Sequence, residues 1–300
     1  MEILLYTIVF LLLLVVSNVT NRFLPQLPLP LVQIVLGISL GFILPQEKFH
    51  LDTELFLALV IGPLLFREAE ESNITSILKH WRIVLYLIFP VIFISTVGLG
   101  YLAHLLWGAL PLAACVAVGA ALGPTDLVAF ASLSERFSFP KRVENILKGE
   151  GLLNDASGLV AFRVALLAWT TGSFSLGKAS ISLVLSIIGG FAIGMLSAGL
   201  NRWLHKLLMS AQVSDIASEL LLELSLPLVT FFLAEEIHVS GIIAVVVAGI
   251  FKASRFKRIT LLEAQVDSVT ETIWNTVNFM LNGSVFIILG MELEMISEPI

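Results

Sequence analysis

The chain has 300 residues and a net charge of −6; 57% of its residues are hydrophobic and only 13% are charged. A soluble domain contains roughly 25% charged residues, so this composition excludes an ordinary soluble protein and predicts an all-α, polytopic membrane protein. The negative charge, with no basic stripe that carries interleaved aromatic residues, argues against nucleic acid as a partner. We expect the chain to lie in a lipid bilayer.

Ten apolar segments have the length of a membrane span or nearly so. A transmembrane helix needs about 20 apolar residues, and fewer where it is broken or buried among other helices. The segments are Ile3–Val19, Leu29–Leu44, Leu51–Phe66, Ile83–Trp107, Leu110–Leu133, Ile146–Thr170, Ala179–Leu204, Ile216–Ala234, Val239–Phe251 and Thr270–Leu293. No linker or soluble domain interrupts them, so residues 1–300 are predicted to form one transmembrane transporter domain.

The basic residues indicate the orientation of this domain. If the N-terminus lies outside, all but three of the 17 Lys and Arg residues fall in cytoplasmic loops; the exceptions are Lys48, Lys178 and Arg163. Cytoplasmic loops carry an excess of Lys and Arg, so this pattern supports ten spans with an outside N-terminus. The predicted location is the cell inner (plasma) membrane, with multiple passes.

Three further patterns concern helix packing and surface position. The faces Gly37–Gly41 and Gly190–Gly194 have small residues at helical spacing and predict close helix contacts, either internal or between subunits. Residues Leu262–Ile273 combine an apolar face with an acidic one. They are predicted to form a helix that lies on the cytoplasmic surface and leads into the tenth span, or a solvated connecting helix.

Ionisable residues in the fifth and sixth spans predict a functional site. Lys148–Val164 reads KGEGLLNDASGLVAFRV and places Glu150 and Asp155 in an apolar stretch, where an ionisable group is costly and marks an ion pathway. Asp126 lies roughly 10 Å from the cytoplasmic end of the fifth span, and Asp155 roughly 13 Å into the sixth. The two carboxylates are therefore predicted at similar depth, and Glu150 shares a helix face with Asn154.

A helix breaker stands next to one of these carboxylates. In Gly123-Pro124-Thr125-Asp126 the proline removes a backbone donor and clashes with the preceding turn. An interrupted helix at membrane depth frees carbonyls that can ligate a cation, a device that transporters use. We therefore predict a discontinuous helix at Gly123-Pro124; the alternative is a simple proline kink.

Asp155 is the candidate group that binds a cation and a proton in turn. A carboxylate is a hard oxygen ligand when ionised and is neutral when protonated. The neighbouring Asn154 can ligate or donate but cannot carry a second proton, which favours one proton exchanged per monovalent cation. Arg163 is roughly 20 Å along the helix from Glu150 and so is not its partner.

Several segments resemble the sodium/proton exchangers of the monovalent cation:proton antiporter-1 family. The most specific signal is a threonine-aspartate pair followed by a glutamate-to-asparagine-aspartate motif. It lies in Ala121–Glu135 and Pro140–Leu166, and supporting patterns lie in Leu27–Gly41, Gly62–Ala69, His238–Gly249 and Asn278–Leu293. The resemblance runs through essentially the whole chain in the family's order.

This resemblance carries roles onto individual residues. It implies cation and proton binding at Asp155, helix-crossing and binding roles for Thr125, Asp126 and Asn154, and a structural ion pair for Glu150. The chain departs from the family pattern in two places. Many members have a serine where this chain has Gly151, and many have a proline where it has Leu127.

The resemblance also implies an architecture. The family has a thirteen-helix inverted-repeat fold with a core and a dimerisation domain, and works as a homodimer by alternating access. Core-type helices would lie within residues 110–170, and interface-type helices within 1–107 and 179–293. The last three helices, including the second crossed helix and the arginine that pairs with Glu150, would lie beyond Ile300. The chain is therefore expected to be the N-terminal part of a longer protein.

The predicted function is electroneutral exchange of Na⁺ or K⁺ for protons. The expected ligands are the transported ions (Na⁺, K⁺ or Li⁺, and H⁺), with no cofactor and no enzymatic activity. A K⁺-selective exchanger is one alternative, since the sequence does not distinguish ions of equal charge. An intramembrane aspartyl protease is another, although it needs a glycine-x-glycine-aspartate loop where this chain has Gly123-Pro124-Thr125-Asp126. A channel is a third.

Overall fold

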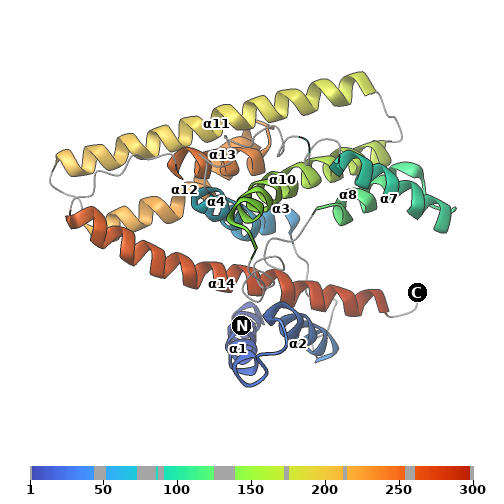
Figure 1. Ribbon diagram of the computed structural model, residues 1–300, viewed down its shortest axis with the longest axis horizontal. Coiled ribbons are helices and arrows are strands. Elements are labelled where there is room, and N and C mark those ends of the chain that lie inside the picture. The colour runs from blue at the N-terminus through green and yellow to red at the C-terminus, as the bar shows by residue number, and fades with distance from the viewer. Residues whose placement is uncertain are drawn as a thin grey trace. The chain divides into compact units, whose positions relative to one another are not determined.

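The computed structural model describes residues 2–43, 52–72, 86, 91–124, 139–171, 176–211, 215–253 and 261–297. Within these ranges all regular secondary structure is helical (Figure 1). The elements are α1 (Glu2–Phe23), α2 (Leu29–Ile43), α3 (Thr53–Phe56), the π-helical turn η2 (Leu57–Ile61), α4 (Gly62–Glu71), α7 (Ile92–Leu106), α8 (Leu112–Leu122), α10 (Lys141–Thr171), α11 (Leu176–Ser210), α12 (Ile216–Glu236), α13 (Gly241–Ala253) and α14 (Leu261–Ser297). The predicted all-α fold class is confirmed.

Each predicted apolar segment contains a described helix or part of one. By length and composition, three described stretches can cross a bilayer alone: Leu185–Ser210, Ile216–Glu236 and Ser268–Leu293. The shorter apolar helices are Ile8–Phe23, Leu29–Phe42, Phe93–Leu106, Leu112–Leu122, Ser157–Thr170 and Gly241–Ala253. Helices of that length suit a protein in which neighbouring helices shield the ends.

Two elements differ from the simple spans predicted. The third span is not one helix but α3, the wide turn η2 and α4; Pro63, the second residue of α4, has no N–H to donate to the preceding turn. The helix predicted at Leu262–Ile273 is present and leads into the tenth span, because α14 runs without a break from Leu261 to Ser297. No glycine or proline interrupts its first 22 residues, and its length of about 55 Å exceeds the roughly 30 Å hydrocarbon core.

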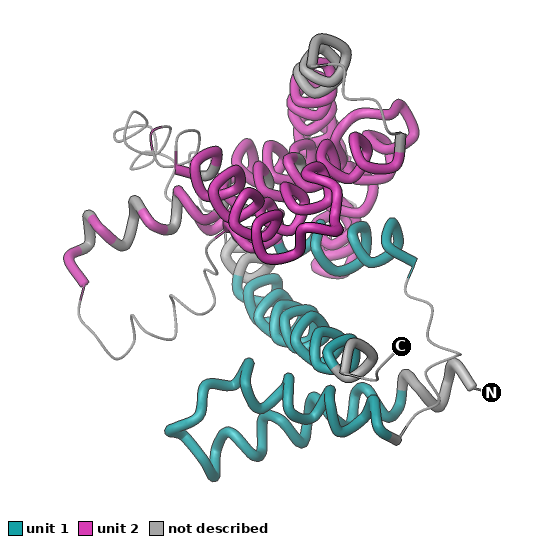
Figure 2. Tube along the Cα trace, turned by 90° about the vertical axis from the view of Figure 1, so that its right-hand side faces the viewer, with its two compact units in different colours: residues 1–64, 259–300 teal, residues 65–258 magenta. Residues whose placement is uncertain are grey.

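The chain divides into two compact units, residues 1–64 with 259–300, and residues 65–258 (Figure 2). In the first unit, α2 packs closely against α14, and α1 contacts both. Gly37 of α2 meets Gly290 of α14: a Cβ added to Gly37 would lie 3.0 Å from the Gly290 Cα. The predicted small-residue face at Gly37–Gly41 thus makes an internal contact.

The second unit contains two groups of mutually packed helices. In one, α8 packs against both α7 and α10; in the other, α11, α12 and α13 pack against one another. Gly190 of α11 lies against α13, because a Cβ there would be 2.7 Å from the Ser240 carbonyl oxygen. The predicted face at Gly190–Gly194 therefore also serves an internal contact. The contacts of α10 with α11 and α13 are much sparser than its contacts with α8.

Candidate functional site

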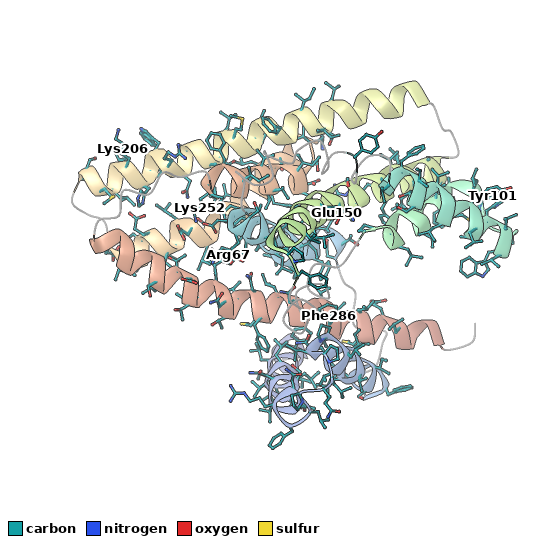
Figure 3. All side chains as sticks on the ribbon, in the orientation of Figure 1. Arg67, Tyr101, Glu150, Lys206, Lys252 and Phe286 are labelled. Atoms are coloured by element: carbon teal, nitrogen blue, oxygen red, sulfur yellow. The ribbon has the colours of Figure 1, made fainter. Side chains whose placement is uncertain are left out.

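Glu150 and Asn154 lie one turn apart on α10 and contact each other. The Asn154 side-chain Nδ2 donates a hydrogen bond of 2.8 Å to the Glu150 carboxylate. Glu150 is 8% exposed and Asn154 only 1%, so a carboxylate and an amide are held together in the interior of the second unit. Figure 3 shows Glu150 on α10 among the packed helices. The sequence spacing anticipated that the two residues share a face.

Helix α8 ends next to this face, at the position of the predicted helix break; the residues after Pro124 lie outside the described part of the chain. Helix α8 ends at Leu122, and Gly123 and Pro124 follow outside it. The Pro124 ring packs on Gly158, which lies one turn beyond Asn154 on α10; a Cβ at Gly158 would collide with the ring. Since proline has no N–H, it cannot pair with the Ala120 carbonyl four residues earlier. That carbonyl oxygen also faces Gly158, at 3.4 Å from the added Cβ.

Helix α7 adds two hydroxyl groups that sequence reasoning missed. A Cβ on Gly123 would lie 3.3 Å from the Ser95 Oγ and 3.5 Å from the Thr96 Oγ1, and Thr96 is only 6% exposed. The end of α8 is therefore bordered by α7 on one side and by α10 on the other. The only signal in the sequence was two adjacent hydroxyl residues in an apolar segment, which is too common to be specific.

The remaining predicted site residues are only partly described. The backbone of Asp155 lies in α10 between Asn154 and Gly158, in the same turn that carries the contact with Pro124, and its side chain lies outside the described part of the structure. Thr125 and Asp126 also lie outside the described residues, directly after Pro124.

Replacing Gly158 by alanine is expected to destabilise the protein and to reduce its activity. The added methyl group has to displace the Pro124 ring, and such overpacking costs typically about 1–3 kcal/mol. Thermal unfolding of the purified protein measures this loss. Gly199→Ala in α11 is the matched control, because a Cβ there meets nothing within 4 Å and alanine favours a helix. Equal thermal stability of the two variants would show that the contact with Pro124 is loose.

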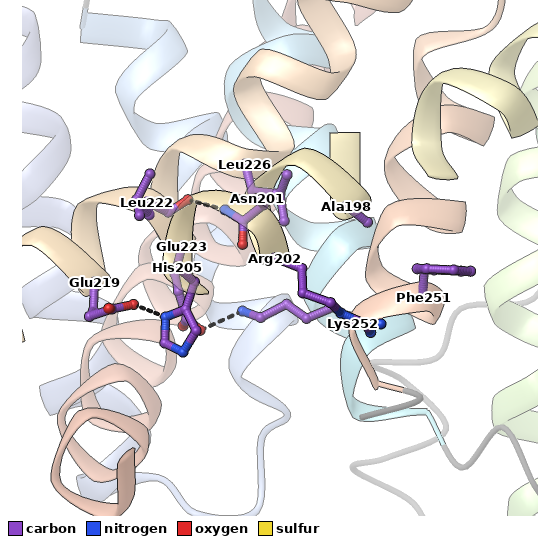
Figure 4. A pocket seen from close by; sticks show the side chains of 10 residues that line it. All are labelled: Ala198, Asn201, Arg202, His205, Glu219, Leu222, Glu223, Leu226, Phe251 and Lys252. Atoms are coloured by element: carbon purple, nitrogen blue, oxygen red, sulfur yellow. Dashed lines mark hydrogen bonds and ion pairs between the residues drawn. The ribbon is translucent and has the colours of Figure 1, made fainter. Parts of the chain in front are cut away.

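A second cluster of charged residues joins α4, α11, α12 and α13. The Lys252 Nζ lies 2.9 Å from a Glu70 carboxylate oxygen and 2.8 Å from one of Glu223, and Arg67 Nη1 lies 2.9 Å from Glu70. His205 contacts Glu219 (Figure 4). The cluster borders a cavity of about 20 Å³, room for about one water molecule. With charges paired in this way, we assign the cluster a structural role.

The charge cluster predicts a dependence of stability on pH. Burial raises the pKa of the Glu70 carboxyl, but the ion pairs with Lys252 and Arg67 outweigh burial and hold the pKa below its ordinary value of 4.5. A carboxyl with a lowered pKa stabilises the fold above its ordinary pKa, and this contribution is lost as the pH falls through the folded-state pKa. The stability deficit of Glu70→Gln relative to the parent should therefore be full near neutral pH and shrink in acid.

Unfolding midpoints of both proteins between about pH 7 and pH 3 test this prediction. Glu71→Gln is the control, because Glu71 also pairs with Arg67 but is 54% exposed, and exposed pairs contribute little. A Glu70→Gln deficit that stays constant across the range would contradict the assigned role of the carboxylate charge.

Comparisons with known proteins identify the family of the chain. The family model described as "Sodium/hydrogen exchanger, transmembrane" matches residues 7–299. The chain is 40% identical over 293 residues to the sodium, potassium, lithium and rubidium/H(+) antiporter of Bacillus subtilis, covering 98% of this chain and 44% of that protein. It is 34% identical over 305 residues to the uncharacterized Na(+)/H(+) exchanger YjcE of Escherichia coli, covering 99% and 54%.

A solved structure gives the same fold. The sodium proton antiporter MjNhaP1 from Methanocaldococcus jannaschii at pH 8 superposes with a TM-score of 0.75 at 18% identity, over 97% of this chain and 71% of that chain. The chain spans less than half the length of the Bacillus relatives. Since the family model nevertheless covers residues 7–299, the chain belongs to the sodium/hydrogen exchanger family.

Proposed function

We propose that the complete protein exchanges monovalent cations for protons across the membrane by alternating access. The observation that supports this most directly is the end of α8 at Gly123-Pro124, where Pro124 packs on α10 next to the buried Glu150–Asn154 pair. An interrupted helix beside buried polar groups is how transporters build a site for a small cation. The Bacillus subtilis relative is named an antiporter of sodium, potassium, lithium and rubidium, which supports Na⁺ and K⁺ as substrates.

In this proposal Asp155 holds either the cation or the proton. Asn154, Thr125 and Asp126 supply further oxygens, and Glu150 holds Asn154 in place. Because Asn154 donates its Nδ2 to Glu150, the other end of the amide is Oδ1, a neutral oxygen of the type that alkali cations prefer. One titrating carboxylate gives one proton per monovalent cation, so exchange is electroneutral.

Other features of the complete protein are part of the same proposal. We infer a location in the inner (plasma) membrane and a homodimer, with core-type helices within residues 110–170 and interface-type helices within 1–107 and 179–293. No cofactor is proposed beyond the transported ions. Selectivity for K⁺ over Na⁺ remains the alternative within this class, because the relative's name includes both ions. The protease alternative is set aside, since the chain belongs to an exchanger family.

Reconstitution of the complete gene product into liposomes tests the proposal. Adding Na⁺, K⁺ or Li⁺ outside should drive protons across the membrane, whatever the membrane voltage. If cation and proton share one carboxylate, they compete, so the apparent KM for the cation should rise by about tenfold per pH unit on the acid side. A KM that does not change with pH would contradict a shared site, and clear voltage dependence would contradict one-for-one exchange.

A further inference from the structure

Arg163 is a charged residue in an apolar part of α10 that the cation site does not use. Its Nη1 lies 3.1 Å from Oε1 of Glu235, near the end of α12. The same carboxylate oxygen accepts a hydrogen bond of 3.1 Å from the backbone N–H of Gly241, the first residue of α13. Arg163 thus connects the helix of the candidate site to the turn between α12 and α13.

This contact joins the two packed helix groups of the second unit. Helix α10 packs mainly against α8, whereas α12 and α13 pack against each other and against α11. Among the residues that the structure describes, Arg163–Glu235 is the ion pair that runs from α10 to the second group. Because the described part of α10 has few contacts with α11 and α13, one group can shift against the other if this pair separates.

The pair is less enclosed by protein than the charge cluster. Arg163 and Glu235 side chains are 38% and 31% exposed, whereas Lys252 and Glu70 in the charge cluster are 11% and 15% exposed. Separating an enclosed ion pair is costly, so of the two the Arg163–Glu235 pair is the easier to separate. Glu235 also keeps a partner when Arg163 leaves, because the Gly241 N–H stays with α13.

We propose that Arg163 is a positioning residue for transport. Its pair with Glu235 holds α10 against the turn between α12 and α13 in one access state and separates in the other. This rests on the proposed function, in which helices move past each other around the ion site. Arg163 lies roughly 12 Å beyond Asp155 along α10, on the outer side in the proposed orientation. The formed pair therefore closes the outer path.

Neutralising the pair should favour the outward-open state. In the complete protein, Arg163→Gln and Glu235→Gln should each lower the apparent KM for external Na⁺ and raise it for internal Na⁺, by up to about fivefold. The external KM is measured in right-side-out membrane vesicles, and the internal KM in everted ones. The charge-exchanged double variant Arg163→Glu/Glu235→Arg should restore both values, and Arg163→Lys should preserve them.

Arg202→Gln is the matched control. Arg202 lies over the Phe251 ring, 5.6 Å from its centroid, and its loss removes one arginine charge from the same unit without touching α10. It should leave the two KM values unshifted. If Arg163→Gln loses thermal stability while both KM values stay unchanged, the pair is a structural contact only and the proposal is overturned.

A distance measurement separates this proposal from the proposed function. Spin labels on Trp169→Cys and Ile237→Cys, in a Cys115→Ala background, report the separation of α10 from the turn after α12; both sites are exposed, at 47% and 54%. The proposal is supported if the labels show two distance populations, if Arg163→Gln changes their ratio, and if the charge-exchanged double variant restores the parent ratio. This result would support the proposal even if the parent protein transported no cation; only the proposed function would then fail. One population that Arg163→Gln leaves unaltered overturns the proposal.

Discussion

Replacing Asp155 by asparagine is expected to abolish cation/proton exchange while the protein stays folded. Asparagine has nearly the same size and keeps one oxygen, but it cannot titrate and carries no negative charge for a cation. The backbone of Asp155 lies in α10, between Asn154 and the Gly158 contact with Pro124, so the substitution acts where the end of α8 meets α10. Proton flux driven by Na⁺ or K⁺ in proteoliposomes measures the loss.

A matched control for this variant is Asp215→Asn. Asp215 precedes α12, and its carboxylate accepts a hydrogen bond of 2.9 Å from the Ser218 N–H as a helix cap. Asparagine caps helices about as well as aspartate, so exchange should be unchanged. If folded Asp155→Asn protein still moved protons in response to cations, another group would have to carry the proton, and the assignment to Asp155 would fail.

Most of the helices were predictable because a membrane helix requires a long run of apolar residues, which can be recognised in the sequence. The end of α8 before Gly123-Pro124 was also predictable, since proline removes a backbone donor. The third span was not, because apolar length does not reveal that Leu57–Ile61 forms a wider turn. The start of α14 was predictable as a helix, because Leu262–Ile273 has apolar residues at helical spacing; its position on the cytoplasmic surface stays a prediction.

The site was predictable only where both partners lie on one helix. Glu150 and Asn154 are four residues apart, so helical spacing alone brings them together. The contact of Gly158 with Pro124 joins two helices, and Arg163 and Glu235 are 72 residues apart. Spacing along a helix does not report such contacts, because they depend on which helices pack together. The glycine faces show the same limit: their sequence indicates close packing but not the partner helix.

Replacing Glu150 by alanine is expected to act more through stability than through ion affinity. Glu150 is 8% exposed and accepts the hydrogen bond from Asn154 Nδ2. Leaving a buried donor without its acceptor costs about 1–3 kcal/mol. If an arginine pairs with Glu150, as the family resemblance implies, removing the carboxylate leaves a buried charge, and the cost rises to about 3–5 kcal/mol.

The variant Glu150→Gln separates these two contributions, because glutamine still accepts a hydrogen bond from Asn154 but has no charge. Thermal unfolding of both variants in the complete protein, together with the apparent KM for Na⁺, measures the effects. Glu71→Ala is the control, since Glu71 is 54% exposed and its removal should change stability little. If Glu150→Gln were nearly as unstable as Glu150→Ala, the charge would be the larger contribution. If both variants unfolded at the parent temperature with a changed KM, Glu150 would instead be a direct ligand of the transported cation.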